Sequence, residues 1–316
     1  MSYIFRSDAP AVGDRVVVRR IVPGTAHRDV GAAHSDIIGH ITAIEPGVSL
    51  SIRPQLTGGY PSSHDSITLR ENEIHIIKKL SPRTIRNSDI RKLELAHAQL
   101  FSSTHEQWTS QGHWLMRAGG PWPWSNTAAP LGPSAAFAEV PIHEITEFFA
   151  AHHTPALLLI PERIGKIADQ WIGLRSHDYL MLTASLESHP TTNVTLDHAW
   201  PTAPHFLPPH LAALLPAPNQ ICASITDNQT ILAAAIARVH EHYLGIAHLE
   251  VLPAYRRRGL ATKLLQALSN WGIEHGATEA IVNISAENST GVAFWQASGF
   301  IEHHRFGYAK FHDSVE

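Results

Sequence analysis

The segment from Leu249 to Ala261 constrains the fold more than any other part of the sequence. It reads Leu-Glu-Val-Leu-Pro-Ala-Tyr-Arg-Arg-Arg-Gly-Leu-Ala, and apolar residues at helical spacing follow it at Leu264, Leu265, Leu268 and Trp271. This pattern predicts a strand that passes through a basic, glycine-containing turn into a helix. The start of a helix has unpaired backbone N–H groups and the positive end of the helix dipole, so the junction predicts an anion-binding site.

Two features of the turn favour a phosphate as the anion. Gly259 and Ala261 lack bulky side chains, so a phosphate can approach the backbone closely. Arg256, Arg257 and Arg258 raise the local positive potential. The chain as a whole has no such potential, because 24 basic and 28 acidic side chains give a net charge of -4. A solvated basic turn that opens a helix is the alternative interpretation.

Composition limits the class of protein. With 316 residues, of which 44% are hydrophobic and 16% charged, the chain has enough apolar matter for more than one core and is not a disordered chain. Its net charge gives no general attraction to nucleic acid or anionic membranes. No segment approaches a membrane span of about 20 apolar residues, and Met1–Val12 lacks a signal-peptide core. The single cysteine, Cys222, excludes an internal disulfide, so we expect a cytoplasmic protein.

Histidine is unusually frequent, with 23 residues spread along the chain. Close pairs such as His152-His153 and His303-His304 lack the spacing of HExxH or zinc-finger motifs. We therefore expect structural or surface histidines and no metal site.

Four parts are predicted along the chain. Residues 1–80 contain five short strand patterns separated by turn formers and predict a small SH3-like β-barrel. Residues 81–106 predict a linker with a connector helix over 88–101, and residues 107–190 and 191–316 each alternate strands and helices. The predicted fold class is therefore α+β, a small barrel followed by an α/β fold.

The expected elements are as follows. Strands are predicted at 15–19, 37–44, 48–52, 67–69, 74–77, 114–116, 156–160, 179–184, 221–225, 231–240, 245–251, 280–284 and 301–311. Helices are predicted at 143–151, 167–174, 211–215, 260–271 and 289–296. The parts 107–190 and 191–316 resemble weak copies of each other, and both a tandem with a degenerate first half and chance alternation remain open.

Motif spacing gives a family resemblance. Arg256-x-x-Gly259-x-Ala261 after a strand resembles the acyl-CoA pyrophosphate signature (Q/R)xxGx(G/A) of the GCN5-related N-acetyltransferases (GNAT), and 293–295 with 298–300 resembles the later helix of that superfamily and its ending. The resemblance covers residues 221–311. It implies a GNAT α/β fold with acetyl-CoA as co-substrate and no metal.

A wider resemblance is carried by Trp114 to Arg117, Ser125-Asn126, Pro130-Leu131-Gly132 and Glu302 to Arg305. These segments resemble a family of two-part actinobacterial acetyltransferases with an SH3-like start. Some members carry histone-acetyltransferase-like labels, and a corynebacterial branch is associated with N-acetylglutamate synthesis. This resemblance implies an amino acid such as L-glutamate as the acceptor.

The implied reaction is direct attack of a primary amine on a thioester, without a covalent enzyme intermediate. The amine must lose a proton and the developing oxyanion needs a fixed donor, which by resemblance is the backbone N–H of Val251. His248 and Glu250 stand just before the turn and are the candidates for the base. They share one face of a regular strand, whereas a bulge would change that.

The thiolate acid departs from the family pattern. Many members have a tyrosine in the late helix, but Trp295 stands at the matching place, and an indole N–H is no practical acid. Tyr308, on a predicted last hairpin, or a water is the alternative acid. Asn288 resembles the asparagine of the family that contacts CoA, and it also fits a helix cap.

The predicted cofactor-binding residues are Val251, Arg256, Arg257, Arg258, Gly259, Leu260, Ala261, Thr262, Asn288 and Trp295. Arg117, Asn126 and Arg305, together with Arg175, are the candidates for binding the acceptor, because arginine can clamp a carboxylate in a bidentate way. Surface ion pairing is the other interpretation of each arginine.

Three functions remain open from the sequence. The first is an acetyl-CoA-dependent N-acetyltransferase that acts on a small amine or amino acid. The second is a protein lysine acetyltransferase whose barrel docks the target, and the third is a non-catalytic CoA-binding adaptor. Arg15, Arg19, Arg20, Lys78 and Lys79 in the first part could meet RNA or a protein, but exposure at a sheet edge explains them too, so nucleic acid is not expected as a partner.

Overall fold

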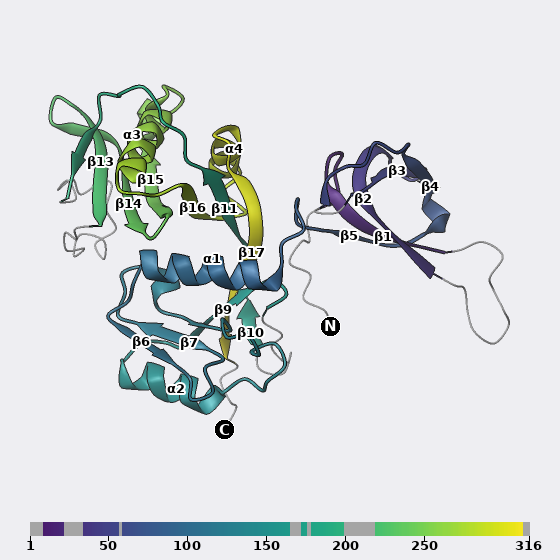
Figure 1. The fold of residues 1–316 in the computed structure, drawn as a ribbon, viewed down its shortest axis with the longest axis horizontal. Helices are drawn as coiled ribbons and strands as arrows, with labels where there is room; N and C mark the ends of the chain where they lie inside the picture. Colours follow the sequence, from purple (N-terminus) through teal and green to yellow (C-terminus); the bar gives the residue numbers. More distant parts are fainter. Residues whose placement is uncertain are drawn as a thin grey trace. The chain divides into compact units, whose positions relative to one another are not determined.

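The chain forms two compact units, Met1–Arg86 and Asn87–Glu316, in a computed structural model (Figure 1). The structure describes residues 9–21, 34–56, 59–164, 172–175, 178–198 and 219–311, without the side chains of 172–175 and 311. The predicted helix at 211–215 lies outside the described residues, as does the first part of the helix predicted at 167–174.

The first unit is an antiparallel sheet with the strand order β4-β3-β2-β1-β5. Its strands are β1 (Arg15–Ile21), β2 (His34–Glu45), β3 (Ser49–Pro54), β4 (Ile67–Arg70) and β5 (Ile74–Lys79). All five predicted strands are confirmed, and alternate residues such as Val16, Val18, Ile41 and Ile52 form the core. The SH3-like barrel is not confirmed, because β4 and β5 stand at opposite edges and the pairing among the described residues leaves the sheet open.

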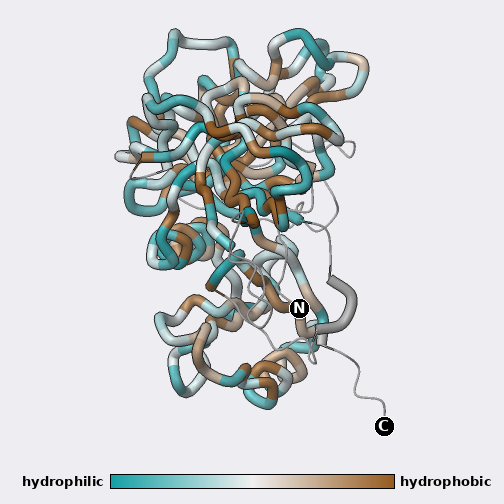
Figure 2. The backbone as a smooth tube through the Cα atoms, turned by 90° about the vertical axis from the view of Figure 1, so that its right-hand side faces the viewer, coloured by the Kyte–Doolittle hydropathy of each residue, from teal (hydrophilic) through white to brown (hydrophobic). Residues whose placement is uncertain are grey.

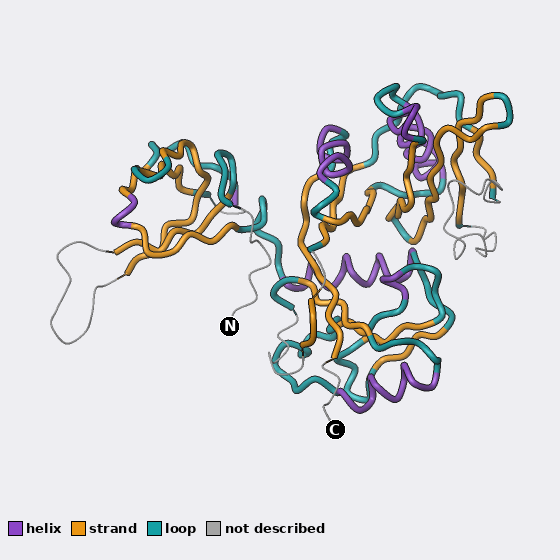
Figure 3. The backbone as a smooth tube through the Cα atoms, turned by 180° about the vertical axis from the view of Figure 1, so that it is seen from behind, coloured by secondary structure: helices purple, strands orange, loops and turns teal. Residues whose placement is uncertain are grey.

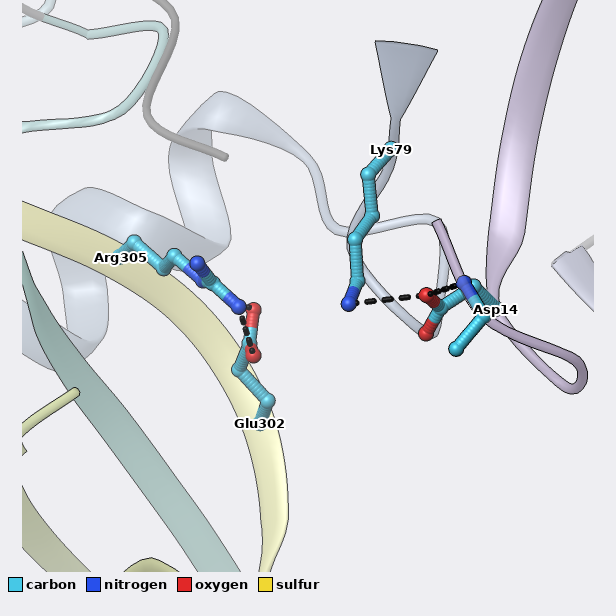
Figure 4. A network of polar contacts seen from close by, with 5 residues as sticks. Asp14, Lys79, Glu302 and Arg305 are labelled. Atoms are coloured by element: carbon cyan, nitrogen blue, oxygen red, sulfur yellow. Dashed lines mark hydrogen bonds and ion pairs between the residues drawn. The ribbon is translucent and has the colours of Figure 1, made fainter. Parts of the chain in front are cut away.

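Several basic side chains of this unit have partners inside it. The Nε atom of Arg19 lies 2.9 Å from Oδ1 of Asp36, and Nζ of Lys79 lies 2.9 Å from Oδ2 of Asp14 (Figure 4). Arg15 is buried. These three residues are therefore engaged within the sheet, which does not support a nucleic-acid surface built on them.

The second unit is built around one large sheet. Its helices are α1 (Asn87–Leu100), α2 (Ile142–Ala151), α3 (Leu260–Glu274) and α4 (Ser289–Ala297). Its strands are β6 (His105–Trp108), β7 (Leu115–Ala118), β8 (Ala128–Ala129), β9 (Leu157–Pro161), β10 (Ile172–Arg175), β11 (Tyr179–Ser185), β12 (Thr195–Asp197), β13 (Gln220–Asp227), β14 (Thr230–His240), β15 (Tyr243–Val251), β16 (Glu279–Ser285) and β17 (Ile301–Phe311). Short 3-10 turns lie at Pro123–Ser125 and Pro253–Tyr255 in this unit, and at Glu71–Glu73 in the first unit.

The large sheet interleaves strands from distant parts of the chain. Its order is β12-β13-β14-β15-β16-β11-β17-β9-β8-β7-β6, with β10 also paired to β17. β11 lies between β16 and β17, and β17 continues from β11 to β9, so the predicted parts 107–190 and 191–316 share one continuous sheet (Figures 1 and 3). Figure 2 colours the backbone by hydropathy and shows hydrophobic (brown) and hydrophilic (teal) stretches alternating along the chain. The four domain boundaries stay predictions.

Helices cover both faces of the sheet at β15. Leu244 and Gly245 are neighbours on that strand, so their side-chain positions point to opposite faces. A Cβ on Gly272 of α3 would lie 2.9 Å from Leu244, whereas a Cβ on Gly245 would lie 3.0 Å from both Leu100 and Phe101 at the end of α1. Gly245 thus lets α1 approach the sheet closely, on the face opposite α3.

Three predicted elements differ from the structure. Residues 172–174 form strand β10 instead of the end of a helix, because the pairing of β10 with β17 overrides the local pattern. Residues 301–311 form one long strand, not a hairpin. α1 is more than a connector, since it buries Ile90 and Leu93 and packs against β14 and β15.

Candidate functional site

The central parallel pair of strands, β15 and β16, separates after three residue pairs. β15 and β16 pair only at Tyr243 with Glu279, Leu244 with Ala280 and Gly245 with Ile281. Both strands continue beyond that point, β15 to Val251 and β16 to Ser285. Within these two described strands, the backbone groups of β15 that face the split have no ladder partner on β16.

The N–H of Val251 points into the split. The N–H of the next residue, Leu252, donates to the carbonyl of Leu232 on the β14 side at 2.9 Å. Because successive N–H groups of an extended chain point to opposite sides, the N–H of Val251 is directed away from β14. Its carbonyl oxygen accepts from Nε of Arg256 at 3.1 Å, which ties the basic turn to the end of the strand.

The predicted turn and helix start are present. Gly259 is the N-cap of α3 with φ of 76°, a left-handed conformation that favours glycine, and α3 begins with Leu260. No described side chain caps this N-terminus, and an added Cβ at Gly259 would meet no described atom within 4 Å. The first helical N–H groups can therefore receive an anion.

The three arginines of the turn are exposed. The guanidinium of Arg258 lies 4.9 Å from the ring centroid of Tyr255 and donates to the carbonyl of Ala254 at 3.3 Å. Arg257 has a φ of 63°. The turn is thus partly fixed by its own side chains while the cationic groups stay at the surface beside the helix start.

The strand that carries the two candidate bases is not regular. Its register to β14 shifts between Ala234 and Ile236, and His248 has a φ of 50°, so a bulge lies at His248. The simple expectation that His248 and Glu250 share one face therefore does not apply. Their side chains nevertheless meet, with Nε2 of His248 3.5 Å from Oε2 of Glu250.

The two predicted residues of α4 have different surroundings: Asn288 stands at the start of the helix, and Trp295 lies in the core. Oδ1 of Asn288 accepts from the N–H of Gly291 at 2.9 Å, so this residue caps α4. Trp295 is buried in the core with its ring 4.8 Å from that of Phe300. The indole therefore packs within the protein.

Tyr308 lies in the part of β17 that pairs with β9. It is buried, and burial raises its pKa well above the ordinary value of a tyrosine. A phenol with a raised pKa is a weaker acid, so this position does not favour a role in protonating a thiolate.

The three candidate acceptor residues have partners inside the protein. Arg117 is buried and donates to the backbone carbonyls of Ala98, Phe101 and Trp124. These bonds hold the guanidinium of Arg117 at the C-terminal end of α1, where backbone carbonyls have no partner within the helix. Arg117 is therefore not presented to a carboxylate substrate.

Asn126 and Arg305 are likewise engaged. The Oδ1 atom of Asn126 accepts from the N–H groups of Gly119 and Gly120, and its Nδ2 donates to two carbonyls of the same turn. Nη2 of Arg305 lies 3.4 Å from Oε2 of Glu302 (Figure 4), and both side chains are largely buried. The side chain of Arg175 lies outside those described.

A buried polar cluster under α1 is missing from the sequence-based site. Glu94 of α1 contacts His304, and His97 of α1 contacts Asn283, with Nε2 of His97 3.1 Å from Nδ2 of Asn283. The signal was present, since Glu94 and His97 interrupt the apolar face of a helix. A sequence alone cannot show which strands that face meets. Among the described residues, no group of three or more His, Cys, Asp or Glu is arranged to hold a metal ion.

These features define a class of fold. A mixed sheet whose central parallel strands separate beside a glycine at the start of a helix is the arrangement expected for a GCN5-related N-acetyltransferase. A solved GCN5-related N-acetyltransferase from Kribbella flavida has this fold, with a TM-score of 0.53 at 14% identity over 71% of this chain and 96% of that chain.

Residues 87–309 match the protein family described as "Probable histone acetyltransferase Rv0428c C-terminal", and the chain belongs to this family. The protein is also similar to an aminoglycoside N(6')-acetyltransferase type 1 of Acinetobacter baumannii, at 35% identity over 27% of this chain and 64% of that relative. A relative of the same description in Salmonella typhimurium is 40% identical over 17% of this chain and 38% of its own length. The chain thus spans less than two thirds of the curated relatives that it matches. No described helix is long and apolar enough to cross a membrane.

Proposed function

We propose that the protein is an N-acetyltransferase that moves an acetyl group from acetyl-CoA to a primary amine. The observation that carries this proposal is the split between β15 and β16 beside the uncapped start of α3. A thioester carbonyl in the split would meet the N–H of Val251, while the diphosphate of CoA would lie on the first N–H groups of α3. A single short turn, between the end of β15 and the start of α3, joins the N–H of Val251 to these N–H groups.

The chain's own groups supply the binding energy for CoA. The N–H groups from Gly259 to Thr262 and the guanidinium groups of Arg256 to Arg258 match a diphosphate in charge and donor number. We propose that the side-chain NH2 of Asn288 contacts CoA, because Oδ1 is engaged in the helix cap. Trp295 is buried and packs against Phe300, so it anchors α4 in the core.

The chemical step is direct attack. The amine nitrogen bonds to the thioester carbon, the oxyanion accepts a hydrogen bond from Val251 N–H, and the C–S bond then breaks to release CoA thiolate. His248 and Glu250 are proposed to receive the amine proton, because their contact lies on the strand that ends in the split. Water is favoured over Tyr308 as the source of the thiolate proton, since Tyr308 is buried with a raised pKa.

A small-molecule amine is the proposed acceptor. The names of the curated relatives point to amine-bearing small molecules, and the family description points instead to a protein lysine, which stays the second candidate. For L-glutamate the structure gives little support, because Arg117 and Arg305 have internal partners. The adaptor without catalysis remains as an outcome of the test.

The test is a thiol-release assay with acetyl-CoA and a panel of amines. The panel contains an aminoglycoside, free L-glutamate and a lysine-containing histone-tail peptide. Release with the aminoglycoside or another small amine supports the proposal, and release with the peptide alone supports the second candidate. CoA binding by calorimetry without thiol release for any amine would refute catalysis and leave a CoA-binding adaptor.

A further inference from the structure

A chain of three ionisable side chains lies between α1 and β17. Oε1 of Glu94 lies 2.9 Å from Nε2 of His304, and Nδ1 of His304 lies 2.8 Å from Nδ1 of His303. Glu94 and His304 are buried, and His303 is half-buried. The order Glu94, His304, His303 therefore leads from the interior towards the surface.

We assign one arrangement of the protons to these contacts. An ionised carboxylate only accepts, so Nε2 of His304 carries the hydrogen that Glu94 receives. Nδ1 of a neutral His304 then accepts from the Nδ1–H of His303. This leaves the lone pair of His303 on Nε2, at the outer end of the chain.

His304 of this chain lies two strands away from Asn283 on β16, the strand that borders the split in the sheet. Asn283 of β16 pairs with Met181 of β11, which pairs in turn with His304, so the three residues form one row across the sheet. Asn283 follows two residues after Ile281, where the pairing of β15 and β16 ends. α1 lies over this row, because Glu94 bonds His304 and, one turn further on, His97 bonds Asn283.

We propose that Glu94, His304 and His303 form a proton relay for acetyl transfer, with Nε2 of His303 as the entry and the carboxylate of Glu94 as the final acceptor. This inference rests on the proposed function and extends it by giving the proton of the acceptor ammonium a destination. His303 receives the proton through water, so the three residues act without touching the substrate.

The acceptor nitrogen loses two protons in the reaction: the relay takes the one that the ammonium loses before attack, and His248 and Glu250 take the one that the amine loses afterwards. Ammonium and acetyl-CoA give the amide, CoA thiol and one proton. An N–H bond of the ammonium breaks and its electron pair stays on nitrogen, while the proton bonds to Nε2 of His303. The Nδ1–H of His303 then moves to Nδ1 of His304, and the Nε2–H of His304 moves to Glu94, which becomes a carboxylic acid. The reverse sequence returns the proton to solvent after turnover.

The surroundings of His303 keep its imidazole neutral and define the charges around the relay. Burial and the neighbouring His304 lower the pKa of His303 to about 4, so its lone pair is available at neutral pH but holds a proton weakly. The ionisable groups that face the relay are Asp89 and His97 of α1, Arg117 of β7, Glu162 and Arg163 after β9, Tyr179 of β11 and Tyr308 of β17.

The experiment compares the pH dependence of turnover in Glu94→Gln and His303→Gln with that of the full-length wild type. The amide oxygen that Glu94→Gln introduces still accepts from His304 but cannot take up the proton. Both variants should lose kcat on the order of 10²-fold, keep the KM for acetyl-CoA, and show a rate that keeps rising with pH towards the pKa of the free amine. Added imidazole should restore part of the rate of His303→Ala.

Matched controls separate this relay from a purely structural role. His143→Gln changes an exposed histidine on α2 that pairs with Glu147, and it should keep the wild-type profile. Circular dichroism and CoA binding check that each variant folds. Wild-type kcat and an unchanged pH profile in Glu94→Gln and His303→Gln would overturn the relay.

A second measurement does not depend on activity. Nitrogen-15 NMR of the imidazoles in the wild type should show His304 protonated on Nε2 and His303 on Nδ1. The opposite pair of tautomers would overturn the relay even if the enzyme is active. If the wild type releases no thiol with any amine, the proposed function fails, and these tautomers still decide the geometry of the chain.

Discussion

Gly259 is the residue whose conformation most directly links backbone geometry to a ligand. Its positive φ disfavours any side chain, and its surroundings among the described residues are open. Gly276, just beyond the other end of α3, has a φ of 87° and is equally open. The two glycines therefore have the same backbone constraint, but only Gly259 adjoins the basic turn.

This pair gives a controlled prediction for CoA binding. Gly259→Ala and Gly276→Ala should each lower the free energy of unfolding by about 1–2 kcal/mol, the cost of a left-handed conformation for an L-residue. Only Gly259→Ala should weaken CoA binding, by about tenfold or more, and Gly259→Glu should abolish it through steric and charge conflict. Calorimetric titration with CoA measures these affinities, and equal affinity in the wild type, Gly259→Ala and Gly276→Ala would contradict a phosphate site at Gly259.

Cys222 is a buried cysteine on an inner strand of the large sheet. It lies on β13, 1% exposed, and burial raises its pKa to about 12. A thiol in this state is a small buried hydrophobe and not a nucleophile.

At the scale of elements, α1 is held at its C-terminal end by arginines from two distant strands. Arg117 of β7 donates to Ala98, Phe101 and Trp124, and Nη1 of Arg238 on β14 donates to the carbonyl of Leu100 at 3.3 Å. Cations at this end also interact favourably with the helix dipole. α1 is thereby fixed to β7 and β14, which lie in different regions of the large sheet.

Removing these donors should cost unequal amounts of stability. Arg117→Met leaves three carbonyls without their buried donor and should lower the free energy of unfolding by about 2–5 kcal/mol. Arg238→Met removes fewer bonds from a half-buried position and should cost about 1–2 kcal/mol. Denaturant unfolding measures the difference, and a smaller effect for Arg117 than for Arg238 would speak against the anchoring of α1 by Arg117.

Elements with clear local patterns could be predicted from the sequence, whereas long-range pairing could not. The helix over 88–101 and the strand–turn–helix at 245–271 follow from periodicity and from Gly259, and the structure has both. The strand at 172–175 depends on its partner β17, and the bulge at His248 depends on its pairing with β14. Neither partner is visible in the local sequence.

Only the contiguous part of the candidate site could be predicted from the sequence. The CoA turn is a contiguous motif, so its residues could be named in advance. Arg117, Asn126 and Arg305 could not be judged, because whether a polar side chain is free depends on carbonyls and carboxylates that only the fold brings near. Glu94, His304 and His303 were missed as a group, since 210 residues separate the first two.

At the scale of the whole molecule, buried neutral imidazoles make stability depend on pH. Burial, with Arg117 and His304 nearby, lowers the pKa of His97 from 6.5 to about 3, and that of His303 is lowered to about 4. An unfolded chain binds these protons near pH 6.5, so between about pH 6.5 and pH 3 it binds more protons than the folded chain. Stability from these groups is therefore fully present above about pH 6.5 and is lost as the pH falls.

We expect the guanidinium chloride concentration at which half of the protein is unfolded to fall steadily as the pH is lowered from about 7 to about 4. His97→Gln should flatten this dependence, because one source of differential proton binding is removed, whereas His143→Gln at an exposed site should leave the slope as it is. A wild-type slope in His97→Gln would show that His97 titrates normally in the folded protein.

The division of the chain into two compact units predicts that each unit folds independently. The first unit has its own core around Val16, Val18 and Ile52, and the family match begins at residue 87, where the second unit also begins. A fragment of residues 87–316 should therefore unfold cooperatively and bind CoA with the affinity of the full chain. Thermal unfolding and calorimetry test this, and loss of CoA binding in a folded fragment would assign the first unit a part in the site.

The placement of β11 between β16 and β17 also dictates when this architecture can be completed. β11 emerges from the ribosome long before either neighbour, and both of its edges must wait until the residues up to Phe306 have been synthesised. The large unit should therefore reach its native state only after the residues up to Phe306 have left the ribosome. Until then, β11 would be an unpaired hydrophobic strand of the nascent chain. Binding of a chaperone to this strand would increase the yield of folded protein.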